Sequence, residues 1–244
     1  MKSALVTGAT RGIGLGVASR LAAQGYDLTI TARDRESLAV VADRLRAEGA
    51  RDVASVAIDL AAEDAAEALA GTHENRYGGM NALILNAGVG TAGRIEDYPI
   101  GRYHKTVAVN LGAPFALLQR CLPLLRNAVR ENAVSGAKVI ALGSIAGVYA
   151  EAGLGVYGAT KAALVSLIET LNAEESGNGI SGTAVAPAFV DTDMSAWARE
   201  SVAREEMIRV DDIVEIVDML LRLSRQAVVP KVVVTRAGTD GFRA

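Results

Sequence analysis

The chain contains 244 residues, of which 50% are hydrophobic and 22% are charged, and its formal net charge is −3. This composition supports a buried core, and it excludes both an intrinsically disordered chain and a strongly basic nucleic-acid-binding surface. The single cysteine, Cys121, excludes an internal disulfide, and the two histidines, His73 and His104, lack metal-ligand spacing, so no metal site is expected. The N-terminus has no signal-peptide pattern and no apolar run is long enough to span a membrane, so we expect a cytoplasmic protein without a membrane partner.

Seven short apolar, β-branched runs alternate with longer segments of helical character. The runs lie at residues 4–6, 28–30, 53–58, 82–85, 138–142, 182–186 and 232–234. This alternation predicts an α/β fold in which a parallel sheet carries helices on both faces. No repeat or linker interrupts the pattern, so we expect a single domain over residues 1–244. Ligands of such sheets bind at the carboxyl ends of the strands.

A glycine-rich turn follows the first run directly, with the sequence Thr7-Gly8-Ala9-Thr10-Arg11-Gly12-Ile13-Gly14. Glycines permit a tight turn and a close backbone approach to a pyrophosphate, whose charge the N–H groups at the next helix start can accept. The spacing differs from the G-x-G-x-x-G fingerprint, and a glycine turn alone is a weak signal. Its position after the first strand favours a cofactor site formed by Gly8, Arg11, Gly12, Ile13 and Gly14.

Further motifs follow the later runs in a fixed order. They are Asn86-Ala87-Gly88, Asn110, Ser144, Tyr157-x-x-x-Lys161 and Pro187. With the glycine turn, this series resembles the short-chain dehydrogenase/reductase family from Lys2 to about Val234. The resemblance implies a single-domain, doubly wound Rossmann fold with a seven-stranded parallel sheet, and a nicotinamide dinucleotide as cofactor.

The end of the second run, Ala32-Arg33-Asp34, bears on which dinucleotide is bound. By resemblance, the acidic residue that selects NAD would stand at Ala32, which has no charge. Arg33 and Arg11 supply two guanidinium groups for a 2′-phosphate, which predicts that NADP(H) is preferred over NAD(H). Asp34 is the rival NAD-selecting residue, but the N-cap of the next helix is its more common role. Solvated surface charge is the alternative role for the two arginines.

The resemblance assigns further cofactor contacts along the same edge of the sheet. Asp59 and Leu60 would contact adenine, although Asp59 is about equally suited to cap a helix. The Asn86-Ala87-Gly88 segment would support the central sheet and let the backbone approach the cofactor. After the sixth run, the resemblance implies nicotinamide contacts at Pro187, Val190 and Thr192.

The implied catalytic residues are Asn110, Ser144, Tyr157 and Lys161. Four-residue spacing places Tyr157 and Lys161 on one helical face. Tyr157 would be the general acid in carbonyl reduction and the base in alcohol oxidation, with a pKa that the Lys161 ammonium lowers by up to about three units. Lys161 would also bind the nicotinamide ribose, Ser144 would hold the substrate oxygen, and Asn110 would hold a water that links Lys161 to solvent.

The substrate side is less specific. Residues 188–210 are a candidate substrate lid, with Trp197 in the stretch 194–207; an ordinary amphipathic surface helix is the alternative. An apolar carbonyl or secondary alcohol is the expected small-molecule substrate. Its candidate contacts are Ile145, Val148, Tyr149, Leu154 and Trp197. The helix over 162–171 could pack across a two-fold axis, so a homo-tetramer or homo-dimer is expected by analogy.

The leading hypothesis is an NADP(H)-dependent oxidoreductase that acts on a carbonyl or secondary alcohol. A non-catalytic dinucleotide-sensing module of the same fold is the alternative, and a scaffold subunit of a larger complex is a third. The set of Ser144, Tyr157 and Lys161 disfavours the sensor, because a protein without turnover has no chemical need for them.

Overall fold

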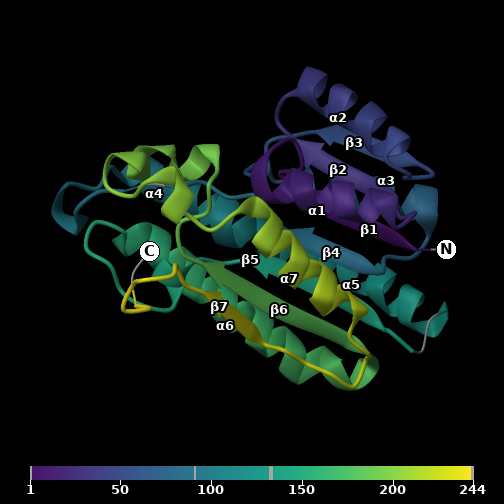
Figure 1. Ribbon diagram of the computed structural model, residues 1–244. Helices are drawn as coiled ribbons and strands as arrows, with labels where there is room; N and C mark the ends of the chain where they lie inside the picture. The colour runs from purple at the N-terminus through teal and green to yellow at the C-terminus, as the bar shows by residue number, and fades with distance from the viewer. Residues whose placement is uncertain (1, 91, 132–133, 243–244) are drawn as a thin grey trace.

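The computed structural model describes residues 2–90, 92–131 and 134–242, and one parallel sheet runs through them (Figure 1). Its seven strands lie in the order β3-β2-β1-β4-β5-β6-β7. Their bounds are β1 Ser3–Thr7, β2 Asp27–Ala32, β3 Val53–Ala57, β4 Ala82–Leu85, β5 Ala137–Leu142, β6 Ile180–Pro187 and β7 Lys231–Val234. Each strand coincides with one of the apolar runs, so the predicted doubly wound, seven-stranded Rossmann fold is confirmed.

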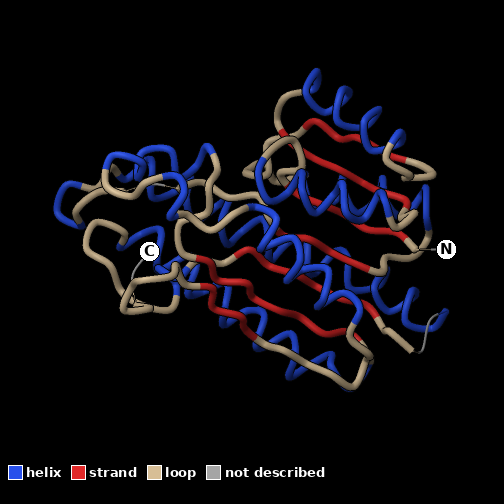
Figure 2. The backbone as a smooth tube through the Cα atoms, in the orientation of Figure 1, coloured by secondary structure: helices blue, strands red, loops and turns tan. Residues whose placement is uncertain are grey.

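Helices cover both faces of the sheet, which Figure 2 shows as red strands between blue helices. The helices are α1 Gly12–Ala23, α2 Arg35–Ala47, α3 Ala65–Tyr77, α4 Ile100–Val107, α5 Ala113–Glu131, α6 Gly155–Glu175 and α7 Val210–Arg222. Apolar side chains of α1, α2 and α7 share one core cluster with the sheet, and those of α3, α5 and α6 share the other. Burial on both faces explains why the strands are apolar at successive positions rather than at alternate ones.

The stretch Ile100–Glu131 is, by length and composition alone, long and apolar enough to cross a membrane. It consists of α4, a π-helical turn over Ala108–Gly112, and α5. The apolar side of α5 packs into the core, where Leu117, Cys121 and Leu124 are at most 2% exposed. Core packing therefore accounts for the hydropathy of this stretch.

The topology of the sheet creates one crevice. Strand β1 pairs with β2 on one side and with β4 on the other, so the connections turn in opposite directions from this point. Loops that leave neighbouring strands in opposite directions separate at the carboxyl edge, and ligands of doubly wound sheets bind there. The glycine turn follows β1 and Asn86 follows β4, so both lie at this crevice.

Candidate active site

A cavity of about 1060 Å³ lies along the carboxyl edge of the sheet. It joins the glycine turn at one end to the α6 tyrosine and lysine at the other. Most residues singled out in the sequence line it, namely Gly8, Arg11, Gly12, Ile13, Arg33, Asp59, Leu60, Asn86, Ala87, Gly88, Ser144, Tyr157, Lys161, Pro187, Val190 and Thr192. Gly14 and Asn110 do not line it, and each has a different position.

The glycine turn is closed by backbone contacts that leave no room for side chains. Gly8 has φ +65°, and a Cβ on it would lie 2.9 Å from Asn86 Nδ2. A Cβ on Gly14 would lie 2.2 Å from the Gly8 carbonyl oxygen, so Gly14 permits the turn from within and does not line the cavity. Asn86 Nδ2 donates to the carbonyl oxygens of Thr7 and Gly8, at 2.9 and 3.1 Å. Asn86 thus holds the turn, which agrees with the supporting role expected for its segment.

The start of α1 suits an anion. Its N-cap residue, Arg11, makes no side-chain cap, so no side chain of the N-cap occupies the N–H groups of the first turn. Those groups and the helix dipole favour negative charge beside Gly12 and Ile13, which both line the cavity. The residues at this end therefore fit a dinucleotide pyrophosphate.

Arg33 and Asp34 follow β2, and both line the cavity. Asp34 Oδ1 accepts a hydrogen bond from the Ser37 backbone N–H at 2.8 Å, which confirms that Asp34 is the N-cap of α2. Hydrogen bonds from the Ser37 side chain and backbone hold the pKa of Asp34 below its usual value. Among the described residues Arg33 forms no ion pair, whereas Arg11 pairs with Asp193 at 3.2 Å. The guanidinium of Arg33 is thus available to a phosphate at this end.

Asp59 lies at the cavity wall after β3, beside Leu60. Its Oδ1 accepts a hydrogen bond from the Ala61 backbone N–H at 3.0 Å. The N-cap of α3 is Asp64, so Asp59 orders the turn before that helix and is not a helix cap.

Ser144 and Tyr157 meet at the other end of the cavity. Ser144 follows β5, and its Oγ accepts a hydrogen bond from the Ala146 backbone N–H at 3.2 Å. Tyr157 lies in the first turn of α6. Burial raises the pKa of Tyr157, and a hydrogen bond with Ser144 lowers it by less. The net direction differs from the lowered pKa expected from the sequence, because burial disfavours the phenolate.

Lys161 lies one helical turn after Tyr157 and is 4% exposed. Its Nζ lies 5.8 Å from the centre of the Tyr157 ring and donates a hydrogen bond to the Leu142 carbonyl oxygen at 2.6 Å. Burial lowers the pKa of Lys161 to about 8. Lys161 therefore loses its proton at a lower pH than an exposed lysine does.

Asn110 lies in the π-helical turn and is 1% exposed. Its Oδ1 accepts from the Val89 backbone N–H at 2.8 Å, and its Nδ2 donates to the Val89 carbonyl oxygen at 3.0 Å and to Thr160 Oγ1 at 3.3 Å. Asn110 thus ties the loop after Gly88 to α6, and a Cβ on Gly88 would lie 3.3 Å from Asn110 Oδ1 and 3.4 Å from Lys161 Nζ. The role of Asn110 in holding a water, which the resemblance implies, stays a prediction.

Residues 190–208, hereafter the 190–208 loop, cover the cavity beside Tyr157. The loop contains two 3-10 helices, Asp193–Glu200 and Arg204–Glu206, in place of one amphipathic α-helix. Its ends meet in a parallel bridge between Val190 and Ile208. Asp191 accepts hydrogen bonds from Arg199 at 2.8 Å and Arg204 at 2.6 Å, and these arginines, Arg204 foremost, hold its pKa below the usual value.

Only some of the residues expected to contact the substrate line the cavity. Leu154 and Trp197 line it, and Trp197 is 58% exposed. Ile145 is 1% exposed within the core, and the ring of Tyr149 packs edge-on against Phe242 with centroids 5.0 Å apart. Val148 does not line the cavity either.

Sequence reasoning missed several residues of the cavity wall. They are Val89, Lys105, Val109, Phe189 and Met194. Phe189 packs edge-on against Trp197 with ring centroids 5.5 Å apart. The apolar character of positions 189 and 194 within the candidate lid was the available signal. Among the described residues, no group of three or more His, Cys, Asp or Glu side chains could hold a metal ion.

Comparison with known proteins agrees with this geometry. A sequence model of the short chain dehydrogenase family matches residues 2–203. The chain is 37% identical over 185 residues to the rhamnolipids biosynthesis 3-oxoacyl-[acyl-carrier-protein] reductase of Pseudomonas aeruginosa, covering 75% of this chain and 71% of that protein. It is 32% identical over 210 residues to the 3-oxoacyl-[acyl-carrier-protein] reductase FabG of Staphylococcus aureus, covering 85% of this chain and 81% of that protein.

A solved structure is also similar. A short chain dehydrogenase from Burkholderia cenocepacia, in complex with NADP, is 29% identical with a TM-score of 0.83, and the match covers 96% of this chain and 95% of that chain. The chain therefore belongs to the short-chain dehydrogenase/reductase family of oxidoreductases.

Proposed function

We propose that this protein is an NADP(H)-dependent oxidoreductase that transfers a hydride between nicotinamide and a carbonyl or secondary alcohol. The observation that carries the proposal is the meeting of Ser144, Tyr157 and Lys161 at one end of a cavity whose other end is the glycine turn. A cofactor stretched between these two ends would bring its reactive ring beside the Tyr157 hydroxyl, which hydrogen-bonds with Ser144 at the cavity wall. When bound, the reduced dinucleotide supplies the hydride.

The dinucleotide would be held along the whole edge of the sheet. The turn from Gly8 to Ile13 and the start of α1 would bind the pyrophosphate. Asp59 and Leu60 would contact adenine. Gly88, which has no side chain, would let the protein backbone approach the nicotinamide ribose, and Lys161 would bind the hydroxyls of that ribose. The nicotinamide end would lie against Pro187, Val190 and Thr192.

Proton transfer falls to Tyr157. Its raised pKa keeps the phenol protonated at neutral pH, as a general acid in carbonyl reduction requires. Ser144 Oγ would hold the substrate oxygen and stabilise the negative charge that develops there. Lys161, on the same helix face, would stabilise the phenolate that remains after the proton has left. In alcohol oxidation the Tyr157 phenolate would act as the base, stabilised by the positive charges of Lys161 and the oxidised cofactor.

The preference for NADP(H) is supported by charge. Arg33 has no carboxylate partner among the described residues, and Ala32 leaves the NAD-selecting position without an acid. Charge-assisted bonds from a guanidinium to a phosphate are among the stronger polar interactions in proteins. The NADP complex of the Burkholderia relative points the same way.

The substrate would enter beneath residues 188–210, which we assign as a lid on the single domain of residues 1–244. Leu154, Phe189, Met194 and Trp197 present apolar surface there. A carbonyl compound with an apolar chain fits this lining, and the names of the two reductase relatives make 3-oxoacyl thioesters the first compounds to test. We assign the enzyme to the cytoplasm, as a homo-tetramer or homo-dimer.

The experiment is a panel of carbonyl substrates, including 3-oxoacyl thioesters, followed through NADPH absorbance with NADH in parallel. Turnover with higher kcat/KM for NADPH supports the proposal. Tight NADPH binding with no turnover across the panel would favour a dinucleotide-sensing module, and a higher kcat/KM with NADH would refute the cofactor assignment.

A further inference from the structure

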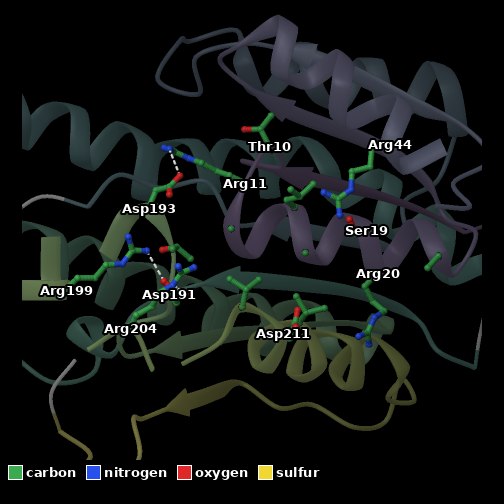
Figure 3. A pocket seen from close by; sticks show the side chains of 17 residues that line it. Thr10, Arg11, Ser19, Arg20, Arg44, Asp191, Asp193, Arg199, Arg204 and Asp211 are labelled. Atoms are coloured by element: carbon green, nitrogen blue, oxygen red, sulfur yellow. Dashed lines mark hydrogen bonds and ion pairs between the residues drawn. The ribbon is translucent and has the colours of Figure 1, made fainter. Parts of the chain in front are cut away.

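One ion pair joins the glycine turn to the 190–208 loop. Arg11 Nη1 lies 3.2 Å from Asp193 Oδ2, and the two side chains are 71% and 70% exposed. Figure 3 shows Arg11 reaching from the start of α1 toward Asp193, with a dashed line between them. Neither residue has another ion-pair partner within the described part of the chain.

The pair stands where two cavities meet. Arg11 and Asp193 line both the large cavity and a smaller one of about 670 Å³. Their neighbours in the chain also lie close together, since a Cβ on Gly12 would lie 3.3 Å from Thr192 Cγ2. Asp193 is also the first residue of the 3-10 helix Asp193–Glu200, so the helix fixes the position of its backbone beside the glycine turn.

The neighbouring acid of the loop does not share this position. Asp191 accepts hydrogen bonds from Arg199 and Arg204, both within the loop, and the second dashed line in Figure 3 joins Arg199 to Asp191. Of these two aspartates, Asp193 is the one that pairs with the glycine turn. A 2′-phosphate that binds Arg11 therefore needs the guanidinium that Asp193 already holds, and two anions on one exposed guanidinium repel each other.

We propose that Asp193 is a cofactor-specificity residue, which competes with the 2′-phosphate for Arg11 and so lowers the affinity for NADPH without affecting NADH. The inference rests on the NADP(H) preference proposed above. Asp193 would moderate that preference, since NADH carries no 2′-phosphate to compete for Arg11. The competition also couples the cofactor to the loop, because binding of the phosphate releases the first residue of the 3-10 helix from the turn.

The test is calorimetric titration of the Asp193→Asn variant with NADPH and with NADH, which needs no turnover. We expect the Kd for NADPH to fall about two- to fivefold, the range for an exposed ion pair, and the Kd for NADH to stay within error. Asp211→Asn is the matched control. Asp211 lines the same small cavity but forms no ion pair with Arg11, so its loss of one negative charge should leave the NADPH to NADH ratio unchanged.

A double-mutant cycle shows whether Asp193 affects NADPH binding through Arg11 or only through the negative charge that it adds near the phosphate. In an Arg11→Ala background, Asp193→Asn should no longer improve NADPH binding. Weaker NADPH binding in Asp193→Asn would mean that Asp193 orients Arg11 productively, and it would overturn the inference. Persistence of the improvement without Arg11 would overturn it too. Failure of the proposed function is seen separately, as wild-type protein that binds NADPH no tighter than NADH.

Discussion

The ammonium nitrogen of Lys161 lies 5.8 Å from the centre of the Tyr157 ring and hydrogen-bonds to the carbonyl oxygen of Leu142. Leu142 ends β5, so this bond anchors the lysine to the carboxyl edge of the sheet. The tyrosine and the lysine share one helix, and the sheet thus determines where both of them stand. Our first two predictions concern this pair.

Tyr157→Phe should lower kcat for carbonyl reduction about 10²- to 10⁴-fold, because the ring remains but the proton donor is lost. The Kd for NADPH should change less than about twofold, since the hydroxyl is proposed to act on the substrate. Steady-state kinetics and calorimetric titration measure the two quantities. Tyr149→Phe is the control, because Tyr149 packs against Phe242 and does not line the cavity. A Tyr157→Phe enzyme with a tenth of wild-type kcat or more would contradict the general-acid role.

Lys161→Met should stabilise the fold at neutral pH while damaging NADPH binding and turnover. The pKa of Lys161 is about 8 in the fold against about 10.5 in an unfolded chain, so the unfolded state binds the extra proton more tightly between these values. The destabilising contribution of buried Lys161 is therefore absent above pH 10.5, grows as pH falls through this window and is complete below pH 8. At pH 7 the buried charge of Lys161 destabilises the wild type by about 3 kcal/mol. Lys161→Met removes this cost but also loses the hydrogen bond to Leu142, which offsets about 1 kcal/mol of the gain in stability.

Urea unfolding at pH 7 and pH 10 checks this balance. The difference between Lys161→Met and wild type should be about 2 kcal/mol at pH 7 and smaller at pH 10. A variant that is less stable than wild type at pH 7 would contradict the prediction, because it would show that the contacts of the buried ammonium outweigh the cost of its burial.

Arg33→Ala should raise KM for NADPH about tenfold or more and leave KM for NADH nearly unchanged, because a charge-assisted bond to the 2′-phosphate is lost. Parallel kinetics with both cofactors give the ratio. Arg35→Ala serves as the control, since Arg35 is an exposed residue of the first turn of α2 that does not line the cavity. Equal losses with both cofactors would argue against recognition of the 2′-phosphate by Arg33.

His73 gives the fold a defined acid sensitivity outside the cavity. It is fully buried, and its ring nitrogens lie 2.9 Å from Thr29 Oγ1, 3.2 Å from Ser3 Oγ and 3.1 Å from the Gly79 carbonyl oxygen. Burial lowers its pKa to about 4, below its value of 6.5 in an unfolded chain. The stability that neutral His73 supports is therefore present above pH 6.5 and is lost as pH falls toward 4, by about 2 kcal/mol at pH 5.

His73→Gln should flatten this part of the stability profile, because glutamine does not titrate. Unfolding at pH 7 and pH 5 should show a smaller loss for the variant than for wild type, even if its stability at pH 7 is lower. Parallel losses in the two proteins would assign the acid sensitivity to other groups.

The sequence predicted most of the fold because the local signals agree with the tertiary structure. The apolar runs are strands, and the residues after β1, β4, β5 and β6 line the cavity because parallel strands end at one edge. Asp34 is the N-cap that its place before a helix predicts, and its partner in the structure, Ser37, is only three positions away. Such short-range relationships can be inferred from spacing alone.

The remaining features depend on contacts between distant segments. Asn110 bonds to Val89, 21 positions away, and nothing near either residue indicates that pairing. The direction of the Tyr157 pKa shift follows from burial, which only the packed structure determines. Of the expected substrate contacts Ile145 and Leu154, only Leu154 lines the cavity, whereas Ile145 is buried in the core.

The bridge between Val190 and Ile208 has a consequence for how such a protein can diversify. A loop whose two ends already meet can be lengthened or exchanged at a small entropic cost, since closure depends only weakly on length. New residues in the stretch 194–207, between these anchors, would alter what the enzyme accepts without shifting Tyr157 or the glycine turn. The fold thus separates a replaceable stretch for substrate choice from the fixed positions that hold the cofactor and carry the chemistry.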